Sequence, residues 1–150
     1  MKANEEETLS VDVTPDEYMA KVVDMCIMKN YVLVSVSETG QTWSSEDDFV
    51  LEKPNLDVQV DENPEVGKVF KIQVSFTNPL NIELTKCNFN VEAPGVIRPH
   101  EITFRSIKPK EKVDADIPLI PRNSGKSTLM VVFNALELFD VAGTKKIEIA

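Results

Sequence analysis

Residues 70–96 read FKIQVSFTNPLNIELTKCNFNVEAPGV, and this stretch decides the fold class. Apolar residues occupy every second position over residues 70–76, and the same alternation returns over residues 87–91. The turn-forming residues 78–80 separate the two runs, and Ala-Pro-Gly at residues 93–95 closes the second run. A two-residue period interrupted by turns predicts antiparallel strands that bury one face.

The same pattern continues to the end of the chain. Nine prolines and only five glycines, together with many short apolar runs, favour a β-sandwich over a helical bundle. The predicted fold class is therefore all-β, an immunoglobulin-like antiparallel β-sandwich preceded by part of a second β-sandwich. The seven strands that a minimal sandwich needs are predicted at residues 55–61, 68–77, 82–92, 97–105, 112–119, 126–135 and 144–150.

The third of these strands changes its buried side. Ile82 and Leu84 share one parity, whereas Cys87 and Phe89 share the other. A strand that switches faces needs an extra residue, so the sequence predicts a β-bulge near residues 85–86. Cys87 falls on the core side, where burial raises the pKa of a thiol and lowers its reactivity.

Residues 1–54 carry shorter patterns. Thr-Pro-Asp-Glu at residues 14–17 is a capping box with proline at the first helical position, which predicts a helical turn over residues 15–21. Residues 29–30 predict a tight turn and residues 38–41 a loop. Pro54 cannot donate to a strand ladder and marks the predicted domain boundary. The predicted strands are residues 9–13, 22–28, 31–36 and one that begins at 49–51, with Leu9, Val11, Val32, Leu33 and Phe49 facing a core.

The composition argues against several function classes. A net charge of −9 with only three arginines argues against a nucleic-acid ligand, because a phosphate-binding surface needs clustered Lys and Arg. The two cysteines, Cys26 and Cys87, match neither a disulfide framework nor a zinc spacing, so we expect buried free thiols in a reducing compartment. The acidic start lacks the apolar stretch of a secretory signal, and no apolar run approaches the roughly 20 residues of a membrane span.

The order of residues also resembles a known family. Phe-Thr-Asn-Pro-Leu at residues 76–80 is followed by Cys-Asn-Phe-Asn-Val-Glu-Ala-Pro-Gly-Val at residues 87–96 and by Arg-Pro at residues 98–99. This order resembles the last C-terminal barrel of animal transglutaminases, and the resemblance covers nearly the whole chain. It implies that residues 55–150 form that second, immunoglobulin-like barrel. Residues 1–54 would then be the C-terminal part of the first barrel, truncated by the start of this chain.

The resemblance implies an acyltransferase parent but places its chemistry elsewhere. Transglutaminases transfer glutamine acyl groups to amines through a Cys-His-Asp triad in a separate core domain, with a motif of the form Gln-Cys-Trp-Val. That motif is absent, and Trp43 has no cysteine near it. The family's calcium sites also lie in the core, so we expect no catalytic, cofactor-binding or metal-binding residue in this chain. The resemblance implies calcium for the parent enzyme alone. Residues 1–54 contain no arginine, which argues against the guanine-nucleotide binding known in some members.

The remaining candidate residues have structural interpretations. His100 is the only histidine, and we expect it in an exposed loop or at the start of a strand. Adjacent acids in an extended chain point to opposite faces, so residues 5–7 and 46–48 predict solvated loop charge instead of a calcium site. The aromatic side chains of the first segment are expected to pack in a core or a domain interface: Tyr18, Tyr31, Trp43 and Phe49.

Two functional hypotheses follow. In the first, the chain is a non-catalytic region that gates or scaffolds a transglutaminase core and contacts partners, in a parent that forms calcium-dependent glutamine-lysine isopeptide bonds. Its expected partners are that core and, through the truncated barrel, a second copy, with no nucleic acid and no membrane span. Its expected location is cytoplasmic, or extracellular by leaderless export. In the second, it is an independent immunoglobulin-like adhesion or interaction module, since one sandwich fold hosts many functions.

Overall fold

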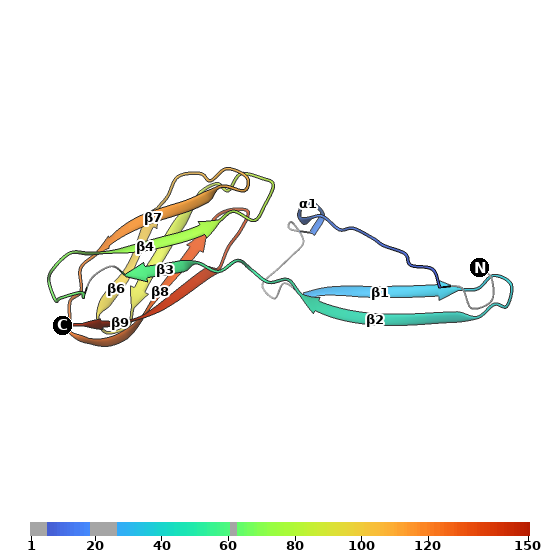
Figure 1. Cartoon of the computed structure of the whole chain (residues 1–150), viewed down its shortest axis with the longest axis horizontal. Helices are drawn as coiled ribbons and strands as arrows, with labels where there is room; N and C mark the ends of the chain where they lie inside the picture. The colour runs from blue at the N-terminus through green and yellow to red at the C-terminus, as the bar shows by residue number, and fades with distance from the viewer. Residues whose placement is uncertain (1–5, 19–26, 61–62) are drawn as a thin grey trace. The chain divides into compact units, whose positions relative to one another are not determined.

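The computed structural model describes residues 6–18, 27–60 and 63–150, and it divides the chain into two compact units. We call Met1–Glu52 the N-terminal segment and Lys53–Ala150 the sandwich domain. Nearly all of the described secondary structure is β-strand (Figure 1). The division falls just before Pro54, where the sequence placed the domain boundary.

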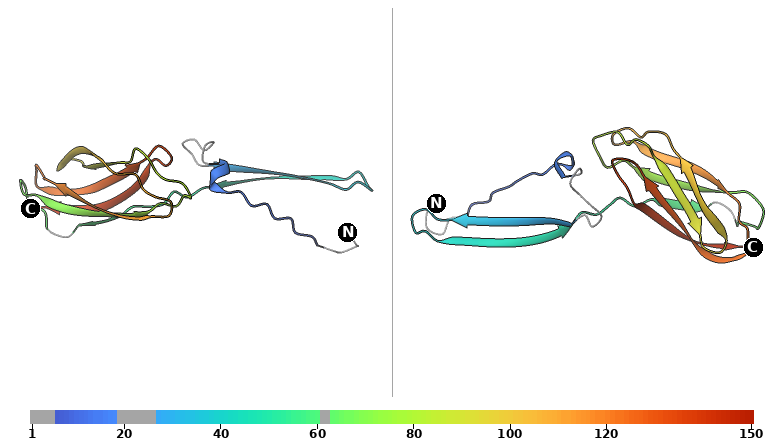
Figure 2. Two further views of the ribbon diagram at one scale, coloured as in Figure 1. Left: turned by 90° about the horizontal axis from the view of Figure 1, so that it is seen from above. Right: turned by 180° about the vertical axis from the view of Figure 1, so that it is seen from behind.

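The sandwich domain has seven strands among its described residues, in two antiparallel sheets. One sheet has the strand order β3-β4-β7 and the other has the order β6-β5-β8-β9 (Figure 2). This all-β sandwich confirms the predicted fold class. The strands are β3 (Asp57–Val60), β4 (Phe70–Thr77), β5 (Asn88–Ala93), β6 (Ile97–Thr103), β7 (Lys112–Leu119), β8 (Gly125–Asn134) and β9 (Val141–Ile149).

Alternation along the strands builds the core between the two sheets. β4 and β7 pair with Phe76 opposite Val113, and alternate residues of both strands are buried. The other sheet contributes Phe133, whose ring centroid lies 4.7 Å from that of Phe76 and 5.2 Å from that of Phe89. Aromatic side chains bury the most apolar area, so the Phe76–Phe133 contact contributes strongly to joining the sheets, while Phe89 and Phe133 pair within one sheet.

A glycine permits the closure of one edge of the sandwich. The Leu56 amide donates a hydrogen bond of 3.1 Å to the Ala142 carbonyl, which brings the chain before β3 against β9. A Cβ atom at Gly143 would lie 2.5 Å from the Leu56 carbonyl oxygen and 2.7 Å from the Leu56 Cβ. Any larger residue would push the two backbones apart, so the close approach requires glycine.

A buried asparagine holds the turn after β4. The Asn78 Nδ2 donates hydrogen bonds to the carbonyls of Ile82 at 2.9 Å and Lys108 at 3.0 Å, and its Oδ1 accepts one from the Leu80 amide at 2.9 Å. These three bonds satisfy a polar side chain that is fully buried. The predicted Asn-Pro-Leu turn is therefore tied to the connection between β6 and β7.

The predicted third strand is broken. Its regular part, β5, begins at Asn88, and before it Leu84 forms only an isolated β-bridge. Lys86 has a φ of 51°, a left-handed conformation that lets the chain change its buried side between Leu84 and Cys87. The prediction of a bulge inside one continuous strand is therefore wrong. Ile82, expected on the buried side, is 40% exposed.

The N-terminal segment contains a helical turn and a hairpin. In α1 (Pro15–Tyr18), the Thr14 amide and hydroxyl donate to the Glu17 carboxylate at 2.7 and 3.1 Å, so the predicted cap is confirmed. β1 (Ile27–Ser35) pairs antiparallel with β2 (Thr42–Val50), and the predicted loop at residues 38–41 joins them. The rest of the predicted helix and Cys26 lie outside the described residues.

Several predictions for this segment are wrong. Residues 9–13 form no strand, and Leu9 is 90% exposed. Residues 29–30 lie inside β1 and form no turn, because both find ladder partners on β2. The acidic residues 46–48 lie in the middle of β2 and not in a loop, and β2 ends at Val50, where a new strand was expected to begin.

The apolar side chains of the hairpin have no core among the described residues. Val32, Leu33, Tyr31, Trp43 and Phe49 are all exposed, although they were expected to pack inward. Two strands alone cannot cover either face of their sheet, so alternation in the sequence does not produce burial here.

Candidate functional site

The edge of the sandwich opposite Gly143 is open. β6 and β7 are edge strands of different sheets, and they line a hollow of about 330 Å³ together with the residues that follow β7. A neighbouring hollow of about 460 Å³ reaches the turn between β5 and β6 and shares Arg98, Pro99 and Arg122 with the first. Volumes of this size are typical of ligand pockets. We call the two together the edge hollow.

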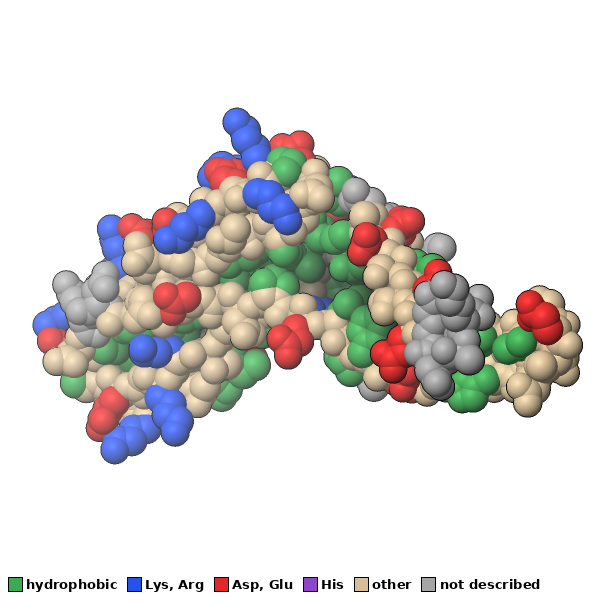
Figure 3. Space-filling view, turned by 45° about the vertical axis from the view of Figure 1, so that its right-hand side comes forward, with side chains coloured by type: hydrophobic (Ala, Val, Ile, Leu, Met, Phe, Trp, Pro, Cys, Tyr) green, Lys and Arg blue, Asp and Glu red, His purple; other side chains and the backbone are tan. Residues whose placement is uncertain are grey.

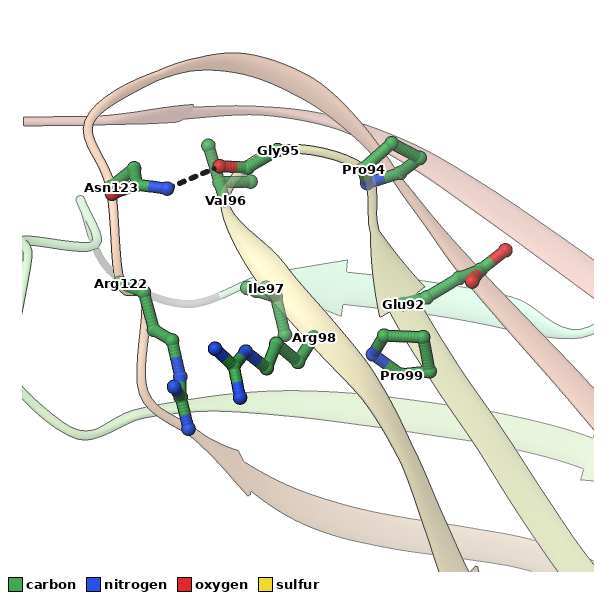
Figure 4. Close-up of a pocket in the computed structure, with 9 residues that line it drawn as sticks. All are labelled: Glu92, Pro94, Gly95, Val96, Ile97, Arg98, Pro99, Arg122 and Asn123. Atoms are coloured by element: carbon green, nitrogen blue, oxygen red, sulfur yellow. Dashed lines mark hydrogen bonds between the residues drawn. The ribbon is translucent and has the colours of Figure 1, made fainter.

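Backbone and side-chain hydrogen bonds fix the loop after β7 against this turn. The Arg122 amide donates to the Val96 carbonyl at 2.8 Å, and the Asn123 Nδ2 donates to the Gly95 carbonyl at 2.8 Å (Figure 4). These bonds place Arg122 beside a residue only two positions before Arg98. Two arginines distant in the sequence therefore line the same hollow.

The two guanidinium groups make one end of the edge hollow cationic. Figure 4 shows the side chains of Arg98 and Arg122 directed to the same end, whereas the Glu92 carboxylate points away from them. Among the described residues, no ion pair or hydrogen bond engages either guanidinium. Paired guanidiniums of this kind can bind carboxylate or phosphate oxygens.

The third arginine is neutralised. Arg105 donates to both carboxylate oxygens of Glu111, at 2.6 and 3.2 Å. The Glu111 carboxylate also accepts the Lys108 amide at 2.8 Å. The Arg105 hydrogen bond, helped by the Lys108 amide, lowers the pKa of Glu111 to about 2. This ion pair fixes the loop between β6 and β7, and it leaves the Arg105 guanidinium already paired with a carboxylate.

Proline protects both strand edges of the hollow. The register of β6 against β5 shifts between the pairs Val91 with His100 and Ala93 with Ile97, so β6 bulges at residues 98–99. Pro99 lies in this bulge, and Pro118 lies near the end of edge strand β7. Proline has no amide hydrogen, so neither position can donate to an added strand. A ligand must therefore be recognised here chiefly through side chains.

The structure places the residues weighed as catalysts apart from each other. His100 is exposed, as expected, but it lies in the middle of β6 and not in a loop or at the start of a strand, and it lines the edge hollow. Cys87 is buried, and desolvation raises its pKa, as expected. The Cys87 carbonyl accepts the Phe104 amide, four residues along the chain from His100, which separates the two by about 13 Å at strand spacing. They form no nucleophile-base pair.

The acidic stretch in β2 shows no metal-binding geometry. Glu46 and Asp48 lie 3.6 and 3.8 Å from the Lys29 Nζ, on one face of the hairpin. Asp47 points to the other face, as alternation requires. No group of three or more His, Cys, Asp or Glu side chains in the described ranges could hold a metal ion. None of the described helices is long and apolar enough to cross a membrane.

The charge of the chain is unevenly divided. The N-terminal segment contains 12 Asp and Glu but only 3 Lys and no Arg, whereas the sandwich domain contains 13 residues of each sign. Lys and Arg side chains stand among acidic ones on the face of the domain seen in Figure 3. The net charge of −9 therefore belongs to the N-terminal segment, and the domain is neutral overall.

Sequence reasoning noted the scarcity of arginine but did not bring Arg98 and Arg122 together. A signal was present, because Arg98 follows the predicted turn at residues 94–95 and Arg122 lies in the predicted turn at residues 121–125. In a sandwich of this strand order, those two turns meet at one end. The convergence depends on the sheet order, which periodicity does not determine.

The chain is similar to known proteins over almost its whole length. A family model described as "Transglutaminase family, C-terminal ig like domain" matches residues 54–150. Hemocyte protein-glutamine gamma-glutamyltransferase of Tachypleus tridentatus is 42% identical over 149 residues, which are 99% of this chain and 20% of that protein. Annulin of Schistocerca americana is 28% identical over 144 residues, 95% of this chain and 19% of that protein. The chain thus spans about a fifth of the length of these relatives.

Solved structures show the same likeness. Red sea bream transglutaminase superposes with a TM-score of 0.76 at 26% identity, over 90% of this chain and 20% of that one. A CARDB domain from Pyrococcus furiosus, solved in complex with di-metal ions, superposes with a TM-score of 0.52 at 16% identity over 65% of this chain and 88% of that one. The second likeness shows a shared fold alone.

Proposed function

Because this chain belongs to the transglutaminase family, with the family's C-terminal immunoglobulin-like domain at residues 54–150, we propose that it is the non-catalytic end of a protein-glutamine gamma-glutamyltransferase. The identity of 42% over 99% of the chain, reaching only 20% of the relative, carries this proposal. The described residues bring no nucleophile and base together. The contribution of this region is accordingly to bind and position.

The parent enzyme is proposed to join glutamine and lysine side chains in a calcium-dependent reaction, with its triad and calcium sites in a core domain upstream of this chain. The sandwich domain then gates or scaffolds that core. Interfaces between domains of one chain are commonly small and polar, so displacement of one domain from another is the default expectation. A neutral domain with one cationic hollow can make contacts of this kind.

The first test is an activity assay of the purified chain. Incorporation of a labelled primary amine into a glutamine-containing protein is measured with and without calcium, beside an active transglutaminase as positive control. We expect no incorporation by this chain under either condition. Incorporation above the no-enzyme background would overturn the proposal that this region is non-catalytic.

The second test distinguishes the parent enzyme from an independent module. The coding sequence upstream of Met1 is read from the transcript. A papain-like core with a Cys-His-Asp triad supports the transglutaminase parent. An in-frame stop codon upstream of Met1 supports the independent immunoglobulin-like module instead.

The hairpin of the N-terminal segment is proposed to pair with a second copy of this chain. Leu33 and Trp43 are 76% and 59% exposed, and two strands alone leave both sheet faces uncovered. Association must overcome the repulsion between two segments of net charge −9, so added salt should strengthen it by screening.

Sedimentation equilibrium at low and at physiological salt tests this association. Leu33→Gln should weaken the dimer, whereas Leu136→Gln, which alters a leucine of the sandwich domain with similar exposure, should not. A monomer at both salt concentrations, or equal effects of the two substitutions, would remove the proposal of self-association.

A further inference from the structure

We propose that the edge hollow is a binding site for an acidic peptide segment of a partner protein, in which Arg98 and Arg122 hold two carboxylates. The site goes beyond the proposed function, and it holds whether or not the domain contacts a catalytic core. Its recognition chemistry is charge-assisted hydrogen bonding at one end and apolar contact along the walls.

The distribution of arginine is the first argument. The chain has three arginines, and two of them line the edge hollow, where neither has an ion-pair partner among the described residues. The third, Arg105, is held in a bidentate pair by Glu111. The domain thus neutralises one guanidinium internally and leaves two directed to the same place. Arginine favours carboxylates because its planar fork matches two oxygens at once.

The walls of the hollow are the second argument. Val96 and Ile97 are buried where they line it, Pro99 and Pro118 are exposed on the two edge strands, and Ile120 is 55% exposed. An inorganic anion would use the guanidiniums alone. A peptide that alternates acidic and apolar residues would use both the guanidiniums and this apolar wall. Arginine beside desolvated apolar surface is also typical of the contact centres of protein interfaces.

The positions of the prolines and of Glu92 define the mode and direction of binding. Pro99 and Pro118 prevent strand addition at the hollow, so the peptide is held by its side chains. The Glu92 carboxylate points away from the arginines and repels a further acid at the far end. The site therefore selects a short segment whose acids lie at one end.

The test measures binding of a fluorescein-labelled peptide, Gly-Glu-Ile-Glu-Pro-Leu-Gly, to the full chain by fluorescence anisotropy. The matched control peptide carries Gln in place of both Glu residues. We expect the acidic peptide to bind at an ionic strength of about 0.01 M, where the screening length is about 30 Å, and to weaken with salt. The Gln peptide should bind at least about tenfold more weakly.

Variants of the chain locate the site. Arg98→Gln with Arg122→Gln should weaken acidic-peptide binding by about tenfold or more. Lys145→Gln with Lys146→Gln removes the same charge from exposed positions of β9 and should change it by less than about twofold. Arg98→Lys with Arg122→Lys keeps the charge but loses the fork, so an intermediate loss is expected. All these side chains are exposed, so the substitutions should leave the fold intact. An unchanged thermal melting transition is the control that each variant is folded.

Five results would overturn the proposal. Equal losses in the arginine and lysine double variants would show a response to net charge alone. No binding of the acidic peptide, or equal binding of the Gln peptide, would remove the carboxylate site. Competition by inorganic phosphate as effective as by unlabelled peptide would show a simple anion site. Loss of self-association in Arg98→Gln with Arg122→Gln would make a second copy of this chain the occupant.

Discussion

The sandwich domain and the N-terminal segment show how the same sequence pattern can have two outcomes. Alternate residues of β4 are buried because β4 lies between two strands and opposite a second sheet. β1 and β2 also carry valine, leucine and aromatic residues, yet nearly all of their residues are exposed. Alternation therefore indicates which side chains can share a face. Burial requires a second layer against that face.

The two regions differ equally in electrostatics. The domain balances 13 charges of each sign and neutralises Arg105 with Glu111, whereas the segment holds 12 acids against 3 lysines. Self-repulsion of this size opposes a compact segment and favours contact with oppositely charged or apolar partners. The two regions should therefore differ in stability as well as in charge.

The largest effect is expected from separating the two regions. A chain of residues 53–150 should keep nearly the whole melting transition of residues 1–150, because its seven strands enclose their own core. Residues 1–52 alone should show no cooperative transition. In the intact chain, amide exchange should be faster in residues 27–50 than in residues 68–135, unless strands pair between copies. Equal protection of the amides in both regions of a monomeric chain would show that the N-terminal segment is as stable as the sandwich domain.

Truncating one phenylalanine in each region makes the second test. Phe133→Ala should lower the free energy of unfolding by about 3 to 5 kcal/mol, because Phe133 contacts Phe76 and Phe89 between the sheets. Phe49→Ala is the matched control and should stay within about 0.5 kcal/mol of the unmodified chain. Denaturant unfolding measures both. Similar losses would show that the hairpin has a core of its own.

Within the domain, Cys87→Ser should cost more than His100→Ala. The first places a hydroxyl in a buried site beside the Leu84 carbonyl, at a cost of about 1 to 3 kcal/mol. The second changes an exposed side chain on β6, and its effect should lie within about 0.5 kcal/mol. The reverse order, measured by denaturant unfolding, would mean that His100 has a structural contact.

The smallest effect is expected at Glu111, and it depends on pH. Since folding lowers the pKa of Glu111 from 4.5 to about 2, the ionised carboxylate stabilises the folded state above pH 4.5 and this contribution is lost as the pH falls through 2. Glu111→Gln should therefore lower the melting temperature at pH 7, and the difference should shrink between pH 4.5 and 2. Glu148→Gln, whose contact with Lys126 spans 3.7 Å, is the control and should show little change.

Much of the domain could be predicted because its information is local. Periodicity located all seven strands, including β7 with its observed bounds, and the capping box located α1. The parity of Cys87 predicted its burial and the direction of its pKa. Strand alternation and cap chemistry act over a few residues, so a single sequence is enough to detect them.

The predictions for the hairpin and for the residues before β5 failed for a different reason. Lys29 and Asn30 are typical of a turn, but their partners on β2 extend the strand through them. The parity switch was detected correctly, whereas its position before the strand depends on the left-handed Lys86. In the hairpin, pairing with β2 overrode the local preference for a turn.

Local periodicity was thus sufficient for the strands, the caps and the core face of this protein, because neighbouring residues interact within one element. The strand order within the two sheets, and the packing of one sheet on the other, decided which distant residues meet. They bring Leu56 against Gly143 at the closed edge and Arg98 against the loop of Arg122 at the open one. Residues 24 to 87 positions apart meet only after the sheets have packed, so no local pattern records which of them will meet.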